Sequence, residues 1–145
     1  MEKHHYVEYI PIPIYPGVLI LIFSNDLLAV KKTKIISEKA LEDEENIYSC
    51  TYYGGKSDGL TTFIICFNFW SVKYESLTIG AICHEVNHCG NNILHHINAK
   101  PNWDNDEQES YLKGWIGDQI QKMMIEHNIQ LEGFKNESTG SNKEK

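Results

Sequence analysis

Short apolar runs separated by turn residues predict β-strands in the first half of the chain. The longest run, VLILIF at 18–23, predicts a buried strand, and the alternating isoleucines and prolines of segment 9–17 suit an extended edge element. Two runs rich in β-branched and aromatic residues, 47–53 and 60–70, are separated by the turn-forming sequence GGKSDG and predict an antiparallel hairpin. The charged segment 31–45 fits either a short amphipathic helix or an exposed excursion.

The apolar period becomes helical after about Tyr74. Positions 77, 81, 84, 88 and 91 are spaced by three or four residues, which predicts a helix that ends near Ile97. The turn-forming segment NAKPNWDND follows, and a second helix is expected to begin at 104–106. Its apolar stripe consists of Tyr111, Leu112, Trp115, Ile116, Ile120 and Met123.

These elements predict an α+β fold with a small, mainly antiparallel sheet packed on the two helices. With 145 residues, of which 41% are hydrophobic, the chain can bury one core but not two. We therefore expect a single domain within residues 1–132. Residues 133–145 contain too few apolar side chains to pack, and we expect them to form a disordered tail.

The charge balance excludes the common nucleic-acid-binding classes. The formal net charge is -7, and all 13 basic residues are lysines, so the arginine forks that read phosphates and guanines are absent from the sequence. The longest apolar run is far shorter than the roughly 20 residues that span a bilayer. We expect a soluble, cytoplasmic protein with neither a nucleic acid nor a membrane as partner.

The cysteines predict no disulfide framework. Cys50, Cys66, Cys83 and Cys89 lack the CxxC spacing of metal and redox motifs and follow no secretory signal. We therefore expect free, mostly buried thiols, and we interpret Cys83 and Cys89 as small core residues.

The motif HEVNH in the first predicted helix indicates metal chemistry. His84 and His88 are four residues apart, so both imidazoles lie on one helix face and can reach one zinc ion. Glu85 is about 100° further round the helix, where it can act as general base on a water molecule that the ion activates. The alternative is that these residues only decorate a partly buried helix.

A catalytic zinc site needs a third protein ligand and an open position. Glu107 and Glu109 lie at the start of the second helix, which can return alongside the first after the turn. Both can instead belong to capping-box pairs, Asp104 with Glu107 or Asp106 with Glu109, since acidic residues favour a helix N-terminus.

The stretches TIGAICHEVNH and DNDEQESYLKGWI resemble a family of small phage-encoded, zincin-like proteins of the glutamate type, assigned as metallopeptidases. Their second helix carries an E-x-x-[AS]-Y-L-x-x-[WY] pattern, and IPIYPGVLILIFSND is similar to their opening strand. The resemblance implies a minimal zincin-like fold over most of residues 9–120 and makes Glu107 the third ligand. The helical period does not prefer Glu107, because Glu109 lies closer to the apolar stripe, so Glu109 stays open.

Other candidates fit less well. The metzincin pattern HExxHxxGxxH fails, since Gly90 comes one residue early and His95 one late, and His95 is expected in an outer shell or on the surface. Tyr111 fits the core stripe but can also assist an oxyanion. The remaining histidines have no partner spacing and are expected at the surface: His4, His5, His96 and His127.

Two functions follow from these patterns. The first is a zinc-dependent hydrolase, specifically a peptidase acting on a peptide or protein, with Glu85 as general base. The second is a zinc-binding phage protein without catalysis that acts through protein-protein interaction. Glu85 favours the first, because a structural zinc site does not need it, while the short chain leaves little material for a substrate cleft.

Overall fold

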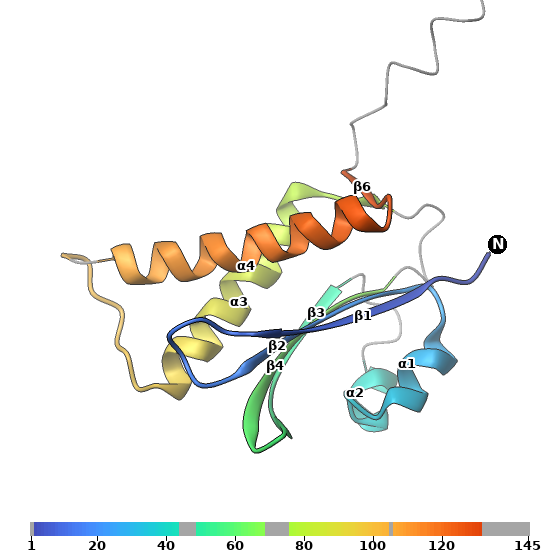
Figure 1. Cartoon of the computed structure of the whole chain (residues 1–145), viewed down its shortest axis with the longest axis horizontal. Coiled ribbons are helices and arrows are strands. Elements are labelled where there is room, and N and C mark those ends of the chain that lie inside the picture. Colours follow the sequence, from blue (N-terminus) through green and yellow to red (C-terminus); the bar gives the residue numbers. More distant parts are fainter. Residues whose placement is uncertain (1, 44–48, 69–75, 105, 132–145) are drawn as a thin grey trace, which may run out of the picture.

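The computed structural model describes residues 2–43, 49–68, 76–104 and 106–131. These residues form an α+β fold with a small mixed sheet and four helices (Figure 1). In chain order the elements are β1 (His5–Pro11), β2 (Val18–Ser24), α1 (Leu27–Thr33), α2 (Glu38–Asp43), β3 (Ser49–Ser57), β4 (Leu60–Asn68), β5 (Ser76–Leu77), α3 (Ile79–His96), α4 (Glu107–Glu126) and β6 (Gln130–Leu131). The expected tail, 133–145, lies outside the described residues.

The main sheet has the order β1-β2-β4-β3. The β1–β2 and β3–β4 pairs are antiparallel, as expected, but the central β2–β4 pair is parallel. The expectation of a mainly antiparallel sheet therefore needs correction: the sheet is mixed. The connection through α1 and α2 leads into the edge strand β3, which runs opposite to β2, and the β3–β4 hairpin then places β4 beside β2 in the same direction. A second sheet pairs β5 with β6, also in parallel.

Helices cover both faces of the main sheet (Figure 1). Leu19, Leu21 and Phe23 of β2 face α3 and α4, and Ile20 and Ile22 face the side of α1 and α2. All five side chains are buried. The continuous apolar run at 18–23 is thus explained by a central strand that is covered on both faces.

The described part of the charged segment 31–45 contains the end of α1 and the whole of α2. It therefore fits the expected amphipathic helix better than the expected exposed excursion. Asp26 caps α1 by accepting a hydrogen bond from the Ala29 backbone N–H at 3.2 Å. The helix ends at Lys34, which adopts a left-handed conformation with φ 56°. Ile36 and Leu41 bury their side chains against the sheet.

The β3–β4 hairpin was expected to turn through the whole of GGKSDG, but the strands continue to Ser57 and resume at Leu60. Only Asp58 and Gly59 form the turn, both with positive φ (48° and 78°), as a two-residue hairpin of this type requires. Gly54, with φ 114°, lies at a shift in strand register between Tyr53 and Lys56.

The two long helices begin in different ways. The Thr78 hydroxyl accepts a hydrogen bond from the Ala81 backbone N–H at 3.0 Å and so caps α3, five residues after the expected start at Tyr74, which lies outside the described residues. Helix α4 starts at Glu107, close to the expected position. No helix among the described residues combines the length and apolar character needed to cross a membrane.

Candidate metal centre

The two histidines of the HEVNH motif converge on the exposed face of α3. Their Nε2 atoms are 3.1 Å apart, and their rings meet edge to face with an interplanar angle of 78°. Two nitrogens at about 2.0 to 2.1 Å from one tetrahedral zinc ion would be roughly 3.3 Å apart. His84 and His88 therefore already fit two positions of a zinc site, and the rest of that coordination shell is open to solvent.

Glu85 lies between α3 and the edge strand β3. Its side chain is only 3% exposed. The Ser49 hydroxyl donates a hydrogen bond to Oε1 at 3.0 Å, and the Thr51 hydroxyl donates one to Oε2. These bonds fix the direction of the carboxylate and link the helix to the strand, because a buried carboxylate needs such partners. The carboxylate points toward β3, whereas the two histidines point outward.

The two candidate third ligands occupy different sides of α4. Glu107 is exposed, and Glu109 is half-buried and bonded to Lys113. Lys113 also donates to Asn87 Oδ1 at 2.8 Å, and Asn87 lies within the HEVNH motif of α3. Glu109 thus lies on the side of α4 that faces α3. Asp106 is the N-cap of α4 but makes no side-chain capping hydrogen bond, so the expected Asp106–Glu109 capping box is not seen.

Gly90 allows this contact between the helices. A Cβ atom at position 90 would lie 2.6 Å from Cγ of Lys113, so the lysine side chain crosses α3 where the backbone is bare. The sequence showed Gly90 only as a misplaced metzincin glycine. A glycine two residues after His88 was the feature of the sequence that could have indicated close helix packing at this position.

Tyr111 and His95 lie away from the motif. Tyr111 is 76% exposed and borders a hollow with Pro13, Ile14 and Tyr15, on the side of α4 that faces the β1–β2 connection. Its expected place in the core stripe is wrong, and its role near an oxyanion stays a prediction. His95 is exposed, as expected.

Comparison with known proteins gives no match. No family model fits the chain, and no curated protein or solved structure is significantly similar to it.

The two cysteines beside the motif differ from each other. Cys89 is fully buried, as expected, and burial followed by the charge of Glu85 raises the pKa of its thiol to about 12. Cys89 is therefore a neutral core side chain at physiological pH. Cys83 is exposed, so its interpretation as a core residue is wrong. Cys66 is buried, and the Cys50 side chain lies outside the description.

An apolar hollow of about 730 Å³ lies between parts of α3 and α4 beside the motif. Cys83 and Val86 line its α3 side, with Asn87 and Lys113 at the polar border. Ile79 and Ile125 also line it and are 64% and 71% exposed. The hollow can accept an apolar side chain from another molecule close to the histidine pair.

A second group of metal-ligating side chains lies elsewhere. Among the described residues, this group consists of Glu8, Glu126 and His127, whose ligand atoms all lie within 4.8 Å of one another. His127 is half-buried and stacked on Tyr6, so its interpretation as an ordinary surface histidine is wrong.

Proposed function

We propose that the chain is a zinc-dependent hydrolase of the peptidase class with a minimal zincin-like fold. The observation that carries this proposal is the convergence of the His84 and His88 Nε2 atoms, 3.1 Å apart on the exposed face of α3, with Glu85 next to His84 in the same helical turn. A site that only stores zinc needs the two imidazoles but not the glutamate next to them in the motif. The resemblance to the phage-encoded zincin-like family supports the same assignment.

The residues of the chain would divide the work between binding and proton transfer. A bound zinc ion would supply Lewis acidity, which lowers the pKa of a water molecule toward about 7 and polarises a carbonyl group. Glu85 accepts the proton of the attacking water at a carboxylate oxygen and donates it to the departing amine. The carboxylate points toward β3, where Ser49 and Thr51 hold it, so the Glu85 side chain would have to turn toward the histidine pair to act as this base.

For the third ligand we propose Glu109. Glu107 is the residue that the family pattern implies, but Glu109 lies on the side of α4 that is tied to Asn87 through Lys113. The Lys113 ammonium joins Glu109 to Asn87, so the Glu109 carboxylate would have to exchange Lys113 for the zinc ion to serve as the third ligand. Release of Lys113 also exposes a cation beside the substrate, where it can attract a carboxylate or carbonyl oxygen.

The second candidate function, a zinc-binding protein without catalysis that acts through protein-protein interaction, is favoured by one observation. The hollow between α3 and α4 carries two exposed isoleucines, Ile79 and Ile125, at its border. Exposed apolar side chains around a hollow are typical of protein-binding surfaces. In this function the ion would stabilise α3, and the same hollow would receive a partner side chain in place of a substrate side chain.

The proposed activity is tested by following cleavage of an unfolded protein substrate with zinc-loaded protein. A chelator should abolish cleavage, added zinc should restore it, and His84→Ala should stay inactive after zinc addition, because one imidazole is lost from the ion. The matched control is His95→Ala, an exposed histidine on the same helix, which should cleave at the wild-type rate. Protein that binds zinc but cleaves no peptide or protein substrate would contradict the hydrolase and support the binding protein.

A further inference from the structure

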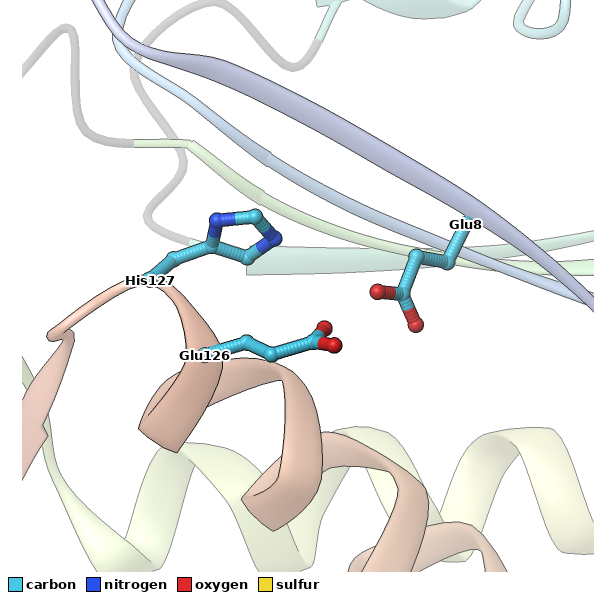
Figure 2. A group of neighbouring side chains, drawn as sticks. All are labelled: Glu8, Glu126 and His127. Atoms are coloured by element: carbon cyan, nitrogen blue, oxygen red, sulfur yellow. The ribbon is translucent and has the colours of Figure 1, made fainter.

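Three ligand-bearing side chains meet where the end of α4 passes strand β1. Figure 2 shows the carboxylates of Glu8 and Glu126 turned toward each other, with the imidazole of His127 beside them. Their ligand atoms all lie within 4.8 Å of one another. The group belongs to a different part of the fold from the HEVNH motif, since it joins β1 to the last turn of α4.

The local structure explains why these side chains share one space. Side chains alternate along a strand, so Glu8 lies on the same face of β1 as Tyr6 and Ile10, which pack toward α3 and α4. The His127 ring stacks on Tyr6 with ring centroids 3.8 Å apart and an interplanar angle of 14°. The Tyr6 hydroxyl is in turn 2.8 Å from His4 Nδ1. The imidazole is therefore held in place by an aromatic neighbour that is itself anchored.

Two carboxylates share this space, with Glu8 and His127 half-buried and Glu126 exposed. Glu126 is the last residue of α4, at the negative end of the helix dipole, where an anionic side chain is destabilising. The Glu8 carboxyl faces it, and burial, followed by the hydrogen bond and charge of Glu126, raises the pKa of Glu8 above its usual value. Among the described residues, neither carboxylate forms an ion pair with a lysine.

We propose that Glu8, Glu126 and His127 form a second metal site, for a zinc-type divalent ion that links β1 to the C-terminal end of α4. Two carboxylate oxygens and one imidazole nitrogen form a donor set that zinc accepts, whereas magnesium and calcium prefer oxygen ligands alone. The ion neutralises both carboxylates and offsets the unfavourable charge at the helix end. This site is independent of His84 and His88 and of the proposed hydrolase function.

The test counts zinc ions on the full chain by equilibrium dialysis and metal analysis. The double variant His84→Ala/His88→Ala should keep about one zinc ion per chain. Adding Glu8→Gln should remove this ion. The zinc affinity should fall by at least about 10- to 100-fold, which is the loss expected even for an outer-shell partner of a metal ligand. Glu2→Gln, which changes an exposed glutamate six residues before Glu8, is the matched control and should keep the ion. A double variant that binds no zinc, or a Glu8→Gln chain that binds as tightly as its parent, would overturn the site.

A second measurement separates loss of the ion from loss of folding. Without zinc, Glu8→Gln should unfold at the same temperature as its parent or higher, because it removes one of two facing anionic groups. With zinc, the melting temperature of the double variant should rise and that of its Glu8→Gln derivative should not. An equal rise in both chains would overturn the proposal. Failure of the hydrolase proposal would leave this result unchanged, since the histidines of α3 are already absent.

Discussion

Replacing Glu85 by glutamine is expected to lower the hydrolysis rate by about 10² to 10⁴-fold, the usual contribution of a general base. Glutamine has the size of glutamate but cannot take a proton from the attacking water. Folding should survive, because the hydroxyls of Ser49 and Thr51 can rotate to accept hydrogen bonds from the new amide as well as donate to its oxygen. The measurement is kcat/KM on a peptide substrate, with zinc content and urea unfolding recorded on the same preparation.

The matched control for this substitution is Glu42→Gln, which makes the same change at an exposed position of α2. It should leave kcat/KM at the wild-type value. If Glu85→Gln cleaved as fast as the wild type while retaining zinc, Glu85 would serve only to fasten α3 to β3, and the general base would have to be another residue.

The double variant Ser49→Ala/Thr51→Val is expected to be the most destabilising polar change near the site. Each substitution removes a hydrogen bond to a buried charged group, worth about 1.5 to 3 kcal/mol. The sum is a large share of the roughly 5 to 15 kcal/mol by which small domains are stable. Urea unfolding followed by circular dichroism gives the free energy of unfolding directly.

Ser110→Ala, at an exposed position of α4, is the control for this pair and should change the free energy of unfolding by no more than about 0.5 kcal/mol. A similarly small change in the double variant would mean that water satisfies the Glu85 carboxylate. The edge strand would then have no part in directing the proposed base.

The strands and helices could be predicted largely from the sequence because their signals are local. VLILIF is apolar at every position, and the start of α4 at Glu107 lies next to the expected 104–106, whereas the start of α3 was expected five residues too early. The parallel pairing of β2 with β4 could not be predicted. It depends on the path of the chain between the two strands, and the apolar pattern of either strand does not indicate that path. The segment GGKSDG predicted a turn, but its composition did not show that only Asp58 and Gly59 form it.

The candidate site was predictable only where its residues are neighbours in the chain. The spacing of His84 and His88 fixes their common helix face, so the convergence of their imidazoles follows from helix geometry. The burial of Glu85 depends on hydroxyls of a distant strand, and nothing in HEVNH indicates them. The group of Glu8 and His127 joins the two ends of the described chain, and its one sequence signal was an acidic residue in the last turn of a helix.

A zinc titration of the wild type and of single variants tests the central claim, zinc binding by the HEVNH motif, most directly. His84→Ala and His88→Ala should each lower the zinc bound at saturation by about one ion per chain relative to the wild type, because one imidazole leaves too few ligands. Glu109→Ala should weaken this ion more than Glu107→Ala does. If both histidine variants bound as many zinc ions as the wild type, and equally tightly, the motif would not be a metal site.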